Sequence, residues 1–341
     1  MRAVIVGKWL PLHKGHLHLI RTALDMCEHV TVCAFGSQWE RISAEERAAA
    51  IQSWAPRTLE EARRLEVIFT ESCPADPYDE PTWDWWVHEL KSKVPDADTL
   101  FSSEPYGVDY ARRLAINHFL VDLERKSVPI SGTECRLDPM EHWEMIAPSL
   151  RKYFVKKIAI VGAESTGKSS LAVRLASHFG TNFVEETGRS YLESKGDGRG
   201  KQLCTPSDLV AIAYKHAATE DEASALSNRI LFSDTDLMVT AAFGQYYFGK
   251  CPSEVEDLAN ERAPSYTLHL LCSTENPWVD DGTRDCTQVH REWFNARYEA
   301  EMRWRKQAFI KLPCGYEEMF YVAVEAIERT LARRVPLGTR Q

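Results

Sequence analysis

The sequence has no long apolar run and no excess of positive charge. No stretch approaches the roughly 20 apolar residues that span a membrane. A short apolar stretch at the N-terminus is followed at once by Lys8, His13 and Lys14, which argues against a signal peptide. The 41 basic and 50 acidic residues give a net charge of −9, which is not the basic footprint of a nucleic-acid-binding protein. We therefore expect neither a membrane protein nor a partner of DNA or RNA.

The sequence also lacks cysteines at metal-binding spacing and any low-complexity linker. Nine cysteines are present, but none is arranged as CxxC or with another metal-binding spacing. Such cysteines are typical of free thiols in a reducing cytosol, so we expect a cytoplasmic protein. The length of 341 residues predicts two domains. Without a linker between them, we expect the two domains to lie close together.

Two segments begin with the same layout. Residues 2–7 and 156–162 are short apolar runs that end in glycine and lead into an expected helix. Such a run is typical of the first strand of a parallel βα unit. The sequence therefore predicts an α/β protein of two tandem domains, each a mostly parallel sheet flanked by helices. We place the boundary within residues 148–157, which gives domains 1–153 and 154–341.

Further elements follow from apolar runs and capping signals. Helices are expected at 44–54 and 82–93. Strands or strand ends are expected at 29–35, 65–70, 99–104, 118–123, 128–133, 181–186, 230–236, 266–273 and 307–312.

The first glycine turn carries the segment GKWLPLHKGH at residues 7–16. Gly7 lets the backbone approach a ligand closely, and His13 and His16 lie three residues apart where a helix should begin. A helix N-terminus attracts phosphate, and two imidazoles there can donate hydrogen bonds to a polyphosphate. The alternative is a turn shaped by Pro11 and Gly15 with surface histidines.

This segment resembles the GxFxPxHxGH signature of the nucleotidyltransferase superfamily, with Trp9 in place of the usual phenylalanine. A second motif of that family, ISxTxxR, matches residues 130–136. The resemblance implies a Rossmann-like domain in which the histidines hold the triphosphate of ATP and a phosphate attacks its α-phosphorus. The ATP-contact residues that we expect in this domain are Gly7, Lys8, His13, Gly15, His16, Ser131, Thr133 and Arg136, with Arg47 as a weaker candidate.

The residues between these motifs narrow the expected substrate. Trp83 and Trp86 share one face of a predicted helix, where they are either core residues or a platform for a flat cationic ring. Together with the segments SSEPY and VDLER, they resemble the nicotinamide mononucleotide (NMN) adenylyltransferases of the NadR type. The expected contacts to the nicotinamide nucleotide are Trp83, Trp86, Ser103, Tyr106, Asp122 and Arg125.

The second glycine turn is a complete Walker A motif, GAESTGKS, at residues 162–169. In such a loop the backbone N–H groups cradle phosphates, Lys168 reaches the β- and γ-phosphates and Ser169 ligates Mg²⁺. Mg²⁺ is therefore the expected cofactor, with ATP as co-substrate. The expected ATP-binding residues of this loop are Gly162, Glu164, Ser165, Thr166, Gly167, Lys168, Ser169 and Ser170.

Carboxylates and one arginine elsewhere in this half favour a small-molecule kinase. Asp234 and Asp236 end an expected strand as candidates for metal and hydroxyl contacts, and Glu186 ends another. Arg284 lies in a turn-rich segment that resembles a lid and is able to reach the transferred phosphoryl group. Which of Glu186, Asp234 and Asp236 is the base stays open.

These motifs resemble the ribosylnicotinamide kinase domain of NadR proteins, so the resemblance covers residues 2–330. It implies that the C-terminal domain phosphorylates nicotinamide riboside to NMN with ATP. The N-terminal domain then joins AMP to NMN, giving NAD and pyrophosphate. Partners to consider, besides these nucleotides, are a riboside transporter and a second copy of the chain.

Some NadR proteins also carry an N-terminal helix-turn-helix repressor domain, which we do not expect here, because the first motif begins at Gly7. Two rival hypotheses stay open. The P-loop domain is either a kinase or a nucleotide sensor with a regulatory or transporter-coupled role, and the pair of substrates is either this one or another.

Overall fold

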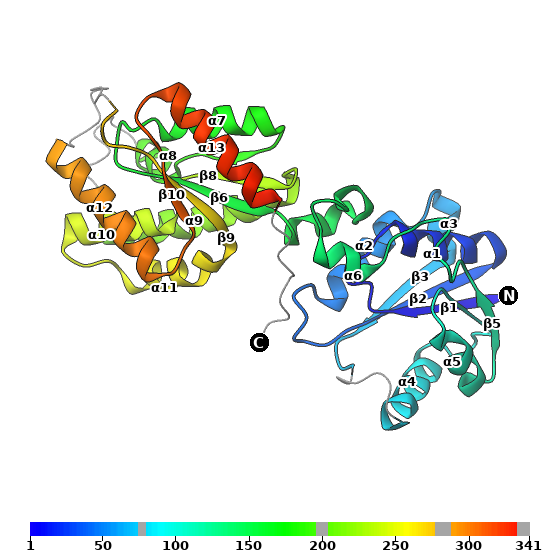
Figure 1. The fold of residues 1–341 in the computed structure, drawn as a ribbon. Helices are drawn as coiled ribbons and strands as arrows, with labels where there is room; N and C mark the ends of the chain where they lie inside the picture. Colours follow the sequence, from blue (N-terminus) through cyan, green and yellow to red (C-terminus); the bar gives the residue numbers. More distant parts are fainter. Residues whose placement is uncertain (74–79, 196–203, 277–287, 333–341) are drawn as a thin grey trace. The chain divides into compact units, whose positions relative to one another are not determined.

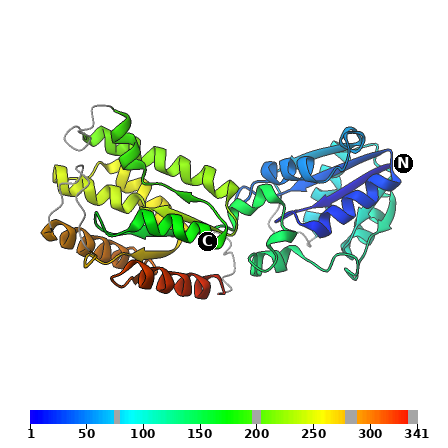
Figure 2. The ribbon, with the colours of Figure 1, turned by 90° about the horizontal axis from the view of Figure 1, so that it is seen from above.

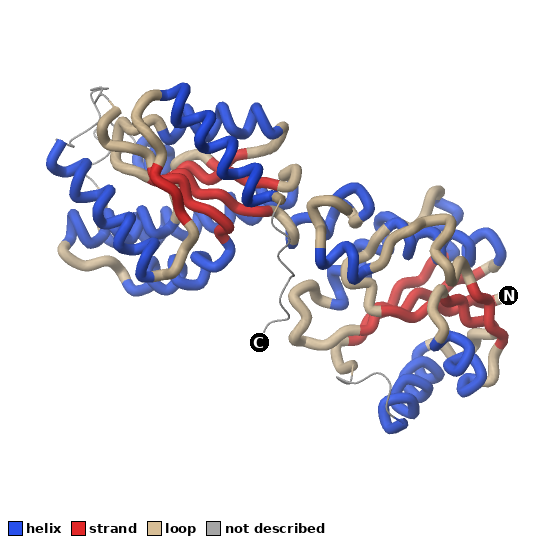
Figure 3. The backbone as a smooth tube through the Cα atoms, in the orientation of Figure 1, coloured by secondary structure: helices blue, strands red, loops and turns tan. Residues whose placement is uncertain are grey.

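The computed structural model describes residues 1–73, 80–195, 204–276 and 288–332. They divide into two compact units, an N-terminal unit that ends at Phe154 and a C-terminal unit that begins at Val155. Each unit has a five-stranded sheet, and every strand pairing described is parallel (Figure 1). Helices pack on both faces of each sheet (Figure 3). The α/β architecture expected from the sequence is thus confirmed.

The N-terminal unit has the strand order β3-β2-β1-β4-β5. Its central strand is buried on both faces, which is why Ala3 to Val6 form a continuous apolar run. The chain leaves β1 toward β2 on one side and later returns to β4 on the other. Ligands of open α/β sheets bind at such a switch point, beyond the carboxyl ends of the strands.

The elements of the N-terminal unit are the strands β1 (Arg2–Gly7), β2 (His29–Phe35), β3 (Leu65–Thr70), β4 (Thr99–Ser102) and β5 (Asn117–Leu120), the helices α1 (Lys14–Met26), α2 (Ala44–Trp54), α3 (Leu59–Arg64), α4 (Glu80–Lys93), α5 (Tyr106–Leu114) and α6 (Gly132–Leu137), and the 3₁₀ helices η1 (Trp143–Met145) and η2 (Pro148–Tyr153).

The strand end expected at residues 128–133 is wrong. The segment is a loop that leads into α6, which begins at Gly132. The reason lies in Asp122, whose carboxylate accepts the backbone N–H groups of Lys126, Ser127 and Val128. These three N–H groups are therefore not available for pairing with a neighbouring strand, and Pro129 has no N–H group at all.

The C-terminal unit has the strand order β10-β9-β6-β8-β7, with β6 at its centre. Helices α7 and α13 lie on one face of the sheet and α10 and α12 on the other (Figures 1 and 2). Separate apolar clusters fill the two faces. One contains Leu171, Leu175 and Phe320, and the other contains Phe294 and Tyr298.

The elements of the C-terminal unit are the strands β6 (Lys156–Val161), β7 (Phe183–Val184), β8 (Ile230–Asp234), β9 (Tyr266–Leu271) and β10 (Phe309–Lys311), the helices α7 (Lys168–Phe179), α8 (Thr187–Ser194), α9 (Pro206–Leu226), α10 (Leu237–Phe248), α11 (Ser253–Arg262), α12 (Gln288–Trp304) and α13 (Tyr316–Leu331), and the 3₁₀ helix η3 (Ala263–Ser265). Within the described residues, none of the helices has the length and apolar character needed to cross a membrane.

Candidate active sites

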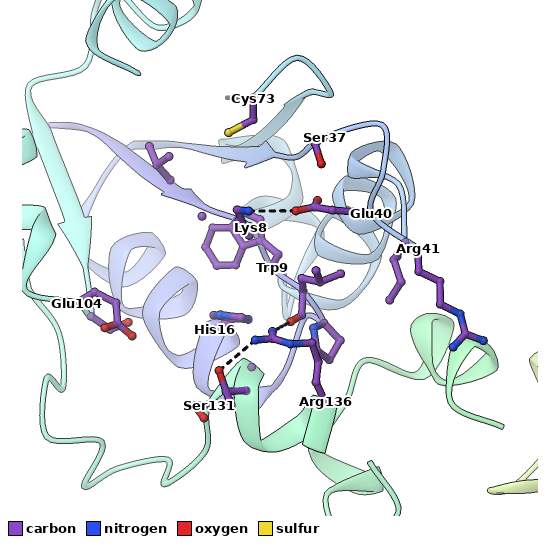
Figure 4. Close-up of a pocket in the computed structure, with 18 of the residues that line it drawn as sticks. Lys8, Trp9, His16, Ser37, Glu40, Arg41, Cys73, Glu104, Ser131 and Arg136 are labelled. Atoms are coloured by element: carbon purple, nitrogen blue, oxygen red, sulfur yellow. Dashed lines mark hydrogen bonds and ion pairs between the residues drawn. The ribbon is translucent and has the colours of Figure 1, made fainter. Parts of the chain in front are cut away.

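The N-terminal unit has a cavity of about 1080 Å³ at the carboxyl ends of its central strands. The loops that follow β1, β2 and β4 form its walls, together with the first turn of α6 (Figure 4). The structure thus brings the two sequence motifs of this unit to one cavity. The expected site residues that line it are Gly7, Lys8, His16, Ser103, Tyr106, Arg125, Ser131, Thr133 and Arg136.

Two contacting rings, those of Trp9 and His16, line this cavity, and the ring of His13 lies behind that of His16. The Trp9 indole donates its N–H to the Cys33 carbonyl at 2.9 Å and meets the His16 ring edge-on at 4.8 Å. His16 in turn stacks on His13, with the ring centroids 3.6 Å apart. His13 is only 4% exposed and lies behind His16, so His16 alone of the two histidines lines the cavity. His13 therefore supports the ring that faces a ligand.

Burial sets the charge of both histidines. It lowers the pKa of His13 to about 4, and the nearby positive charge of Arg125 lowers it further. Burial also lowers the pKa of His16, helped by His13. Both rings are therefore neutral at pH 7. The Nδ1 atom of His16 accepts the His13 backbone N–H at 3.4 Å, so Nε2 carries the proton and can donate it to a ligand.

Arg136 joins the two motifs of the cavity. Its guanidinium donates to the Leu10 carbonyl and to the Thr133 hydroxyl, the latter at 3.0 Å. Figure 4 shows it beside the imidazole of His16. Ser131 caps α6 by accepting the Glu134 N–H at 3.1 Å, and the Glu134 carboxylate accepts the Ser131 N–H at 2.7 Å. This capping box fixes the turn that carries the two hydroxyls.

Lys8 is held at the cavity wall by Glu40, which the sequence analysis did not single out. The two side chains form an ion pair at 3.2 Å (Figure 4). Arg47 is fully buried and pairs with the same carboxylate at 2.6 Å, while donating to the Lys8 carbonyl. The expectation that Arg47 contacts phosphate is therefore wrong, because this side chain holds the loops after β1 and β2 together.

The tryptophan platform expected in this unit does not face the cavity. Trp86 is 8% exposed and packs against Phe35 with the ring centroids 4.8 Å apart. Trp83 packs against Tyr110, and the Arg113 guanidinium lies 5.2 Å from its ring centroid. Neither indole lines the cavity. We correct their assignment from ligand contacts to packing residues, which the i, i+3 spacing alone could not distinguish.

Two other expected contacts also have structural roles. Asp122 accepts the backbone donors of residues 126–128, as described above, and does not line the cavity. Gly15 lies beneath the His13 ring, where a Cβ atom would come within 3.0 Å of it. Both residues shape the loops, so their assignment to ligand contacts is corrected. Arg125 does line the cavity and pairs with Glu104 at 2.6 Å.

The C-terminal unit has a second cavity, of about 290 Å³, formed by the Walker A loop between β6 and α7. Lys168 donates to the Ala163 carbonyl at 2.9 Å, and the Thr166 hydroxyl donates to the same oxygen at 2.8 Å. Gly167 has a φ of +88°, and a Cβ atom there would lie 2.6 Å from the Tyr316 ring. All eight expected ATP-binding residues of this loop line the cavity.

Three residues brace the Walker A loop from behind, and sequence reasoning missed all of them. Asn295 accepts the Ala163 N–H at 2.8 Å, and Asn276 donates to the Thr166 carbonyl at 3.1 Å. Arg291 is 1% exposed and donates to the Glu164 carbonyl at 3.1 Å. They lie more than 100 residues from the loop along the chain, and no motif marks them.

The carboxylates near this loop have different surroundings. Asp234 is 2% exposed and accepts a hydrogen bond from Ser169, while its Oδ1 has no hydrogen-bond partner among the described residues. Burial raises its pKa, and the Lys168 charge opposes this. Glu186 lines the cavity and pairs with Arg189 at 3.3 Å. Arg284 lies outside the described residues.

Asp236 is not at the cavity. It caps α10 by accepting the Val239 N–H at 3.1 Å, and its other oxygen meets His269 at 3.0 Å. Its assignment to metal and substrate contacts is therefore corrected. No group of three or more His, Cys, Asp or Glu side chains in the described part of the chain is arranged to hold a metal. Ser169 and the free Asp234 oxygen suit Mg²⁺, which takes most ligands from phosphates and water.

An aromatic wall lies beside this cavity, in a segment, residues 241–250, that also resembles the kinase domain of NadR proteins. Phe243 lines the cavity and stacks parallel to Tyr247, with the ring centroids 5.9 Å apart. Tyr246 and Trp293 continue the wall, with their centroids 5.0 Å apart. Aromatic faces of this kind can bind a flat or cationic ring.

Comparisons with known proteins agree with this arrangement. A family profile described as an AAA domain matches residues 157–318. The "Trifunctional NAD biosynthesis/regulator protein NadR" of Escherichia coli (strain K12) is 29% identical over 348 aligned residues, which cover 97% of this chain and 83% of that protein. The protein of the same name from Salmonella typhimurium (strain LT2) is also 29% identical, with the same coverage.

Two solved structures have the same fold. The structure of NadR protein in complex with NAD and AMP-PNP has a TM-score of 0.71, with 22% identity and coverage of 98% of this chain and 96% of that one. The structure of NadR protein in complex with NR has a TM-score of 0.74, with 21% identity and 98% coverage of both chains.

Proposed function

Because this chain is homologous to NadR over 97% of its length, we propose that it carries out two successive steps of NAD synthesis. The C-terminal unit phosphorylates the 5′-hydroxyl of nicotinamide riboside with ATP, giving NMN. The N-terminal unit transfers AMP from a second ATP to NMN, giving NAD and pyrophosphate. The observation that carries this proposal is the presence of two phosphate-binding cavities, one after the central strand of each sheet. The solved NadR complexes with NAD, AMP-PNP and NR agree with it.

In the N-terminal unit the residues act by placing two phosphates. His16 donates its Nε2–H, and Lys8 and Arg136 supply positive charge to the triphosphate of ATP. An oxygen of the NMN phosphate then forms a bond to the α-phosphorus, while the bond from that phosphorus to the bridging oxygen breaks and pyrophosphate leaves. No covalent enzyme intermediate is needed, so orientation and charge neutralisation supply the catalysis.

In the C-terminal unit the loop backbone and Lys168 hold the phosphates of ATP. Mg²⁺, held by Ser169 and Asp234, supplies neutralising charge when bound. Glu186 is the base that accepts the proton of the 5′-hydroxyl as this oxygen attacks the γ-phosphorus and ADP leaves. Glu186 is the candidate that lines the cavity, whereas Asp234 is bonded to Ser169 and Asp236 caps a helix.

The aromatic wall favours a riboside over an aliphatic alcohol as the kinase substrate. Phe243 lies at the cavity and its neighbours extend the apolar surface outward. A nicotinamide ring is flat and cationic, so stacking on Phe243 would place the attached ribose toward Glu186.

A time course with purified protein, nicotinamide riboside, ATP and Mg²⁺ tests the proposal, with products separated by chromatography. We expect NAD to accumulate after a transient of NMN. A riboside left untouched while added NMN becomes NAD would contradict the kinase and favour a nucleotide-sensing role for the P-loop unit. NMN that accumulates without NAD would contradict the adenylyltransferase.

A further inference from the structure

The kinase mechanism above does not use His216, a buried histidine in α9. Its side chain is 2% exposed and lies beneath the edge of the sheet that carries the candidate carboxylates. A buried imidazole needs hydrogen-bond partners for its two nitrogen atoms. The partners of His216 lie next to the candidate carboxylates in the sequence.

His216 contacts the neighbours of both carboxylates. Its Nδ1 lies 3.1 Å from the Thr187 hydroxyl, and its Nε2 lies 3.4 Å from the Ser233 hydroxyl. Thr187 directly follows Glu186, and Ser233 directly precedes Asp234. One imidazole thus connects the chain segments that carry the candidate base and the candidate Mg²⁺ ligand.

The segment that carries Glu186 has few backbone hydrogen bonds to the sheet, although α8 beyond it is tied to α9 by Tyr191 and Lys195, which both bond to Asp208. Strand β7 has only two residues, and Val184 pairs with Ser233 of β8. Glu186 is the N-cap residue of α8, yet its side chain makes no capping hydrogen bond. That leaves the carboxylate facing the cavity, and the helix start is held through Thr187 instead.

His216 is itself fixed by a buried carboxylate. Glu220, one turn further along α9, lies 3.6 Å from Nε2 and is fully buried. It accepts the Tyr266 hydroxyl and lies 3.5 Å from the Lys157 ammonium. Burial opposes its charged form, but His216 and Lys157 keep the pKa of Glu220 below its usual value. A charged, fully bonded neighbour leaves the imidazole little freedom to rotate.

We propose that His216 is a positioning residue of the phosphoryl-transfer site, which fixes Glu186 relative to Asp234 through Thr187 and Ser233. This inference rests on the proposed kinase function. The general physical reason is that a misplacement of about 1 Å in a transfer site lowers the rate as much as 100-fold, while binding of the nucleotide by a separate loop is unaffected.

The first test compares His216→Ala with wild type in riboside phosphorylation. We expect kcat to fall about 10- to 100-fold, with the KM for ATP within about twofold of wild type. His216→Asn keeps a polar atom near Thr187 and should recover part of kcat. Conversion of NMN to NAD by the N-terminal unit should not change, which shows that the effect is confined to the C-terminal unit.

Ser224→Ala is the matched control. Ser224 is also buried in α9, eight residues beyond His216 and outside the cavity lining, and its hydroxyl donates to the Glu220 carbonyl. If Ser224→Ala lowers kcat as much as His216→Ala at the same loss of Tm, the effect is ordinary destabilisation and the proposal is wrong. A rise in the KM for ATP with unchanged kcat would also overturn it.

Two further measurements keep the test decisive. Where His216→Ala fails to fold, Thr187→Val replaces it, and the same fall in kcat is expected. Hydrogen exchange of the segment 184–190 needs no substrate, and it should speed up about tenfold in His216→Ala but not in Ser224→Ala. If wild type leaves the riboside untouched, the kinase proposal fails, and this exchange result alone upholds or overturns the positioning role.

Discussion

The two cavities proposed to bind phosphate are built in opposite ways. In the C-terminal unit, the backbone of a glycine-containing loop and one lysine line the cavity, and side chains from distant elements brace that loop from behind. In the N-terminal unit, side chains face the cavity, above all His16 on its stack of rings. The cavity of the C-terminal unit therefore depends on the shape of its loop, whereas the cavity of the N-terminal unit depends on a few side chains.

The cavities also differ in how their charge arises. In the C-terminal unit, Lys168 supplies positive charge as an ammonium group. Burial keeps His16 neutral before any ligand arrives. A neutral donor takes up a proton when an anion binds beside it, while an ammonium group does not change.

Removing Lys168 gives the largest effect that we expect. Lys168→Ala should lower riboside phosphorylation about 1000-fold, because Lys168 is the cation that the loop itself brings to the cavity, while the loop backbone and Arg189 of α8 remain. Conversion of NMN to NAD should stay within twofold of wild type. Comparable losses in both reactions, measured by chromatography, would contradict the assignment of separate cavities.

Removing His16 is the reciprocal change. His16→Ala should lower NAD formation from NMN about 100-fold, because one directional donor to the triphosphate is lost and Arg136 remains. Riboside phosphorylation should be unaffected. His18→Ala, on the same helix outside the cavity, is the matched control. The account is wrong if both substitutions lower the rate equally.

The roles of two acidic residues can be separated within the C-terminal unit. Glu186→Gln should lower kcat for riboside phosphorylation about 100-fold, with little change in Tm. Asp236→Asn should instead lower Tm, because it weakens the α10 cap and the contact to His269. The reverse pattern, in steady-state kinetics and thermal melts, would identify Asp236 as the functional carboxylate.

Proton uptake by the N-terminal cavity on binding ATP is the smallest effect that we expect, and it distinguishes the two cavities most directly. The pKa of His13 is about 4 and that of His16 is also lowered, so bound triphosphate should raise both. ATP affinity of the N-terminal cavity should therefore increase a few-fold as the pH falls from 8 to 6. Titration calorimetry in two buffers measures the uptake in Lys168→Ala protein, and adding His16→Gln should reduce it. If Lys168→Ala protein takes up no protons when it binds ATP, the account is contradicted.

The sequence predicted the backbone of both units well. Strand 2–7 and helix 44–54 have the observed bounds, because buried parallel strands are continuously apolar and Ser43 caps the helix with acidic residues behind it. The expected strand end at 128–133 was wrong, because side-chain bonds of Asp122 capture backbone donors, and this is not visible in an apolar pattern.

The sites were predictable only where a short motif carries the chemistry. The Walker A loop is local, and all of its expected residues line one cavity, whereas only Gly7, Lys8 and His16 of those expected in the histidine segment do so. Roles that depend on tertiary packing were missed or misassigned. Trp86 is a core residue, while the bracing Asn295 and the buried His216 contact residues 17 or more positions away in the sequence and leave no local signal.

The most direct test of the account mixes two variants that each lack one of the two activities. Lys168→Ala and His16→Ala are each incubated with nicotinamide riboside, ATP and Mg²⁺, first alone and then together, and NAD is measured over time. The account predicts little NAD from either variant alone, NMN accumulation with His16→Ala, and NAD formation by the mixture. Ready NAD formation from riboside by Lys168→Ala alone, or a mixture that forms none, would contradict two independent cavities that share NMN.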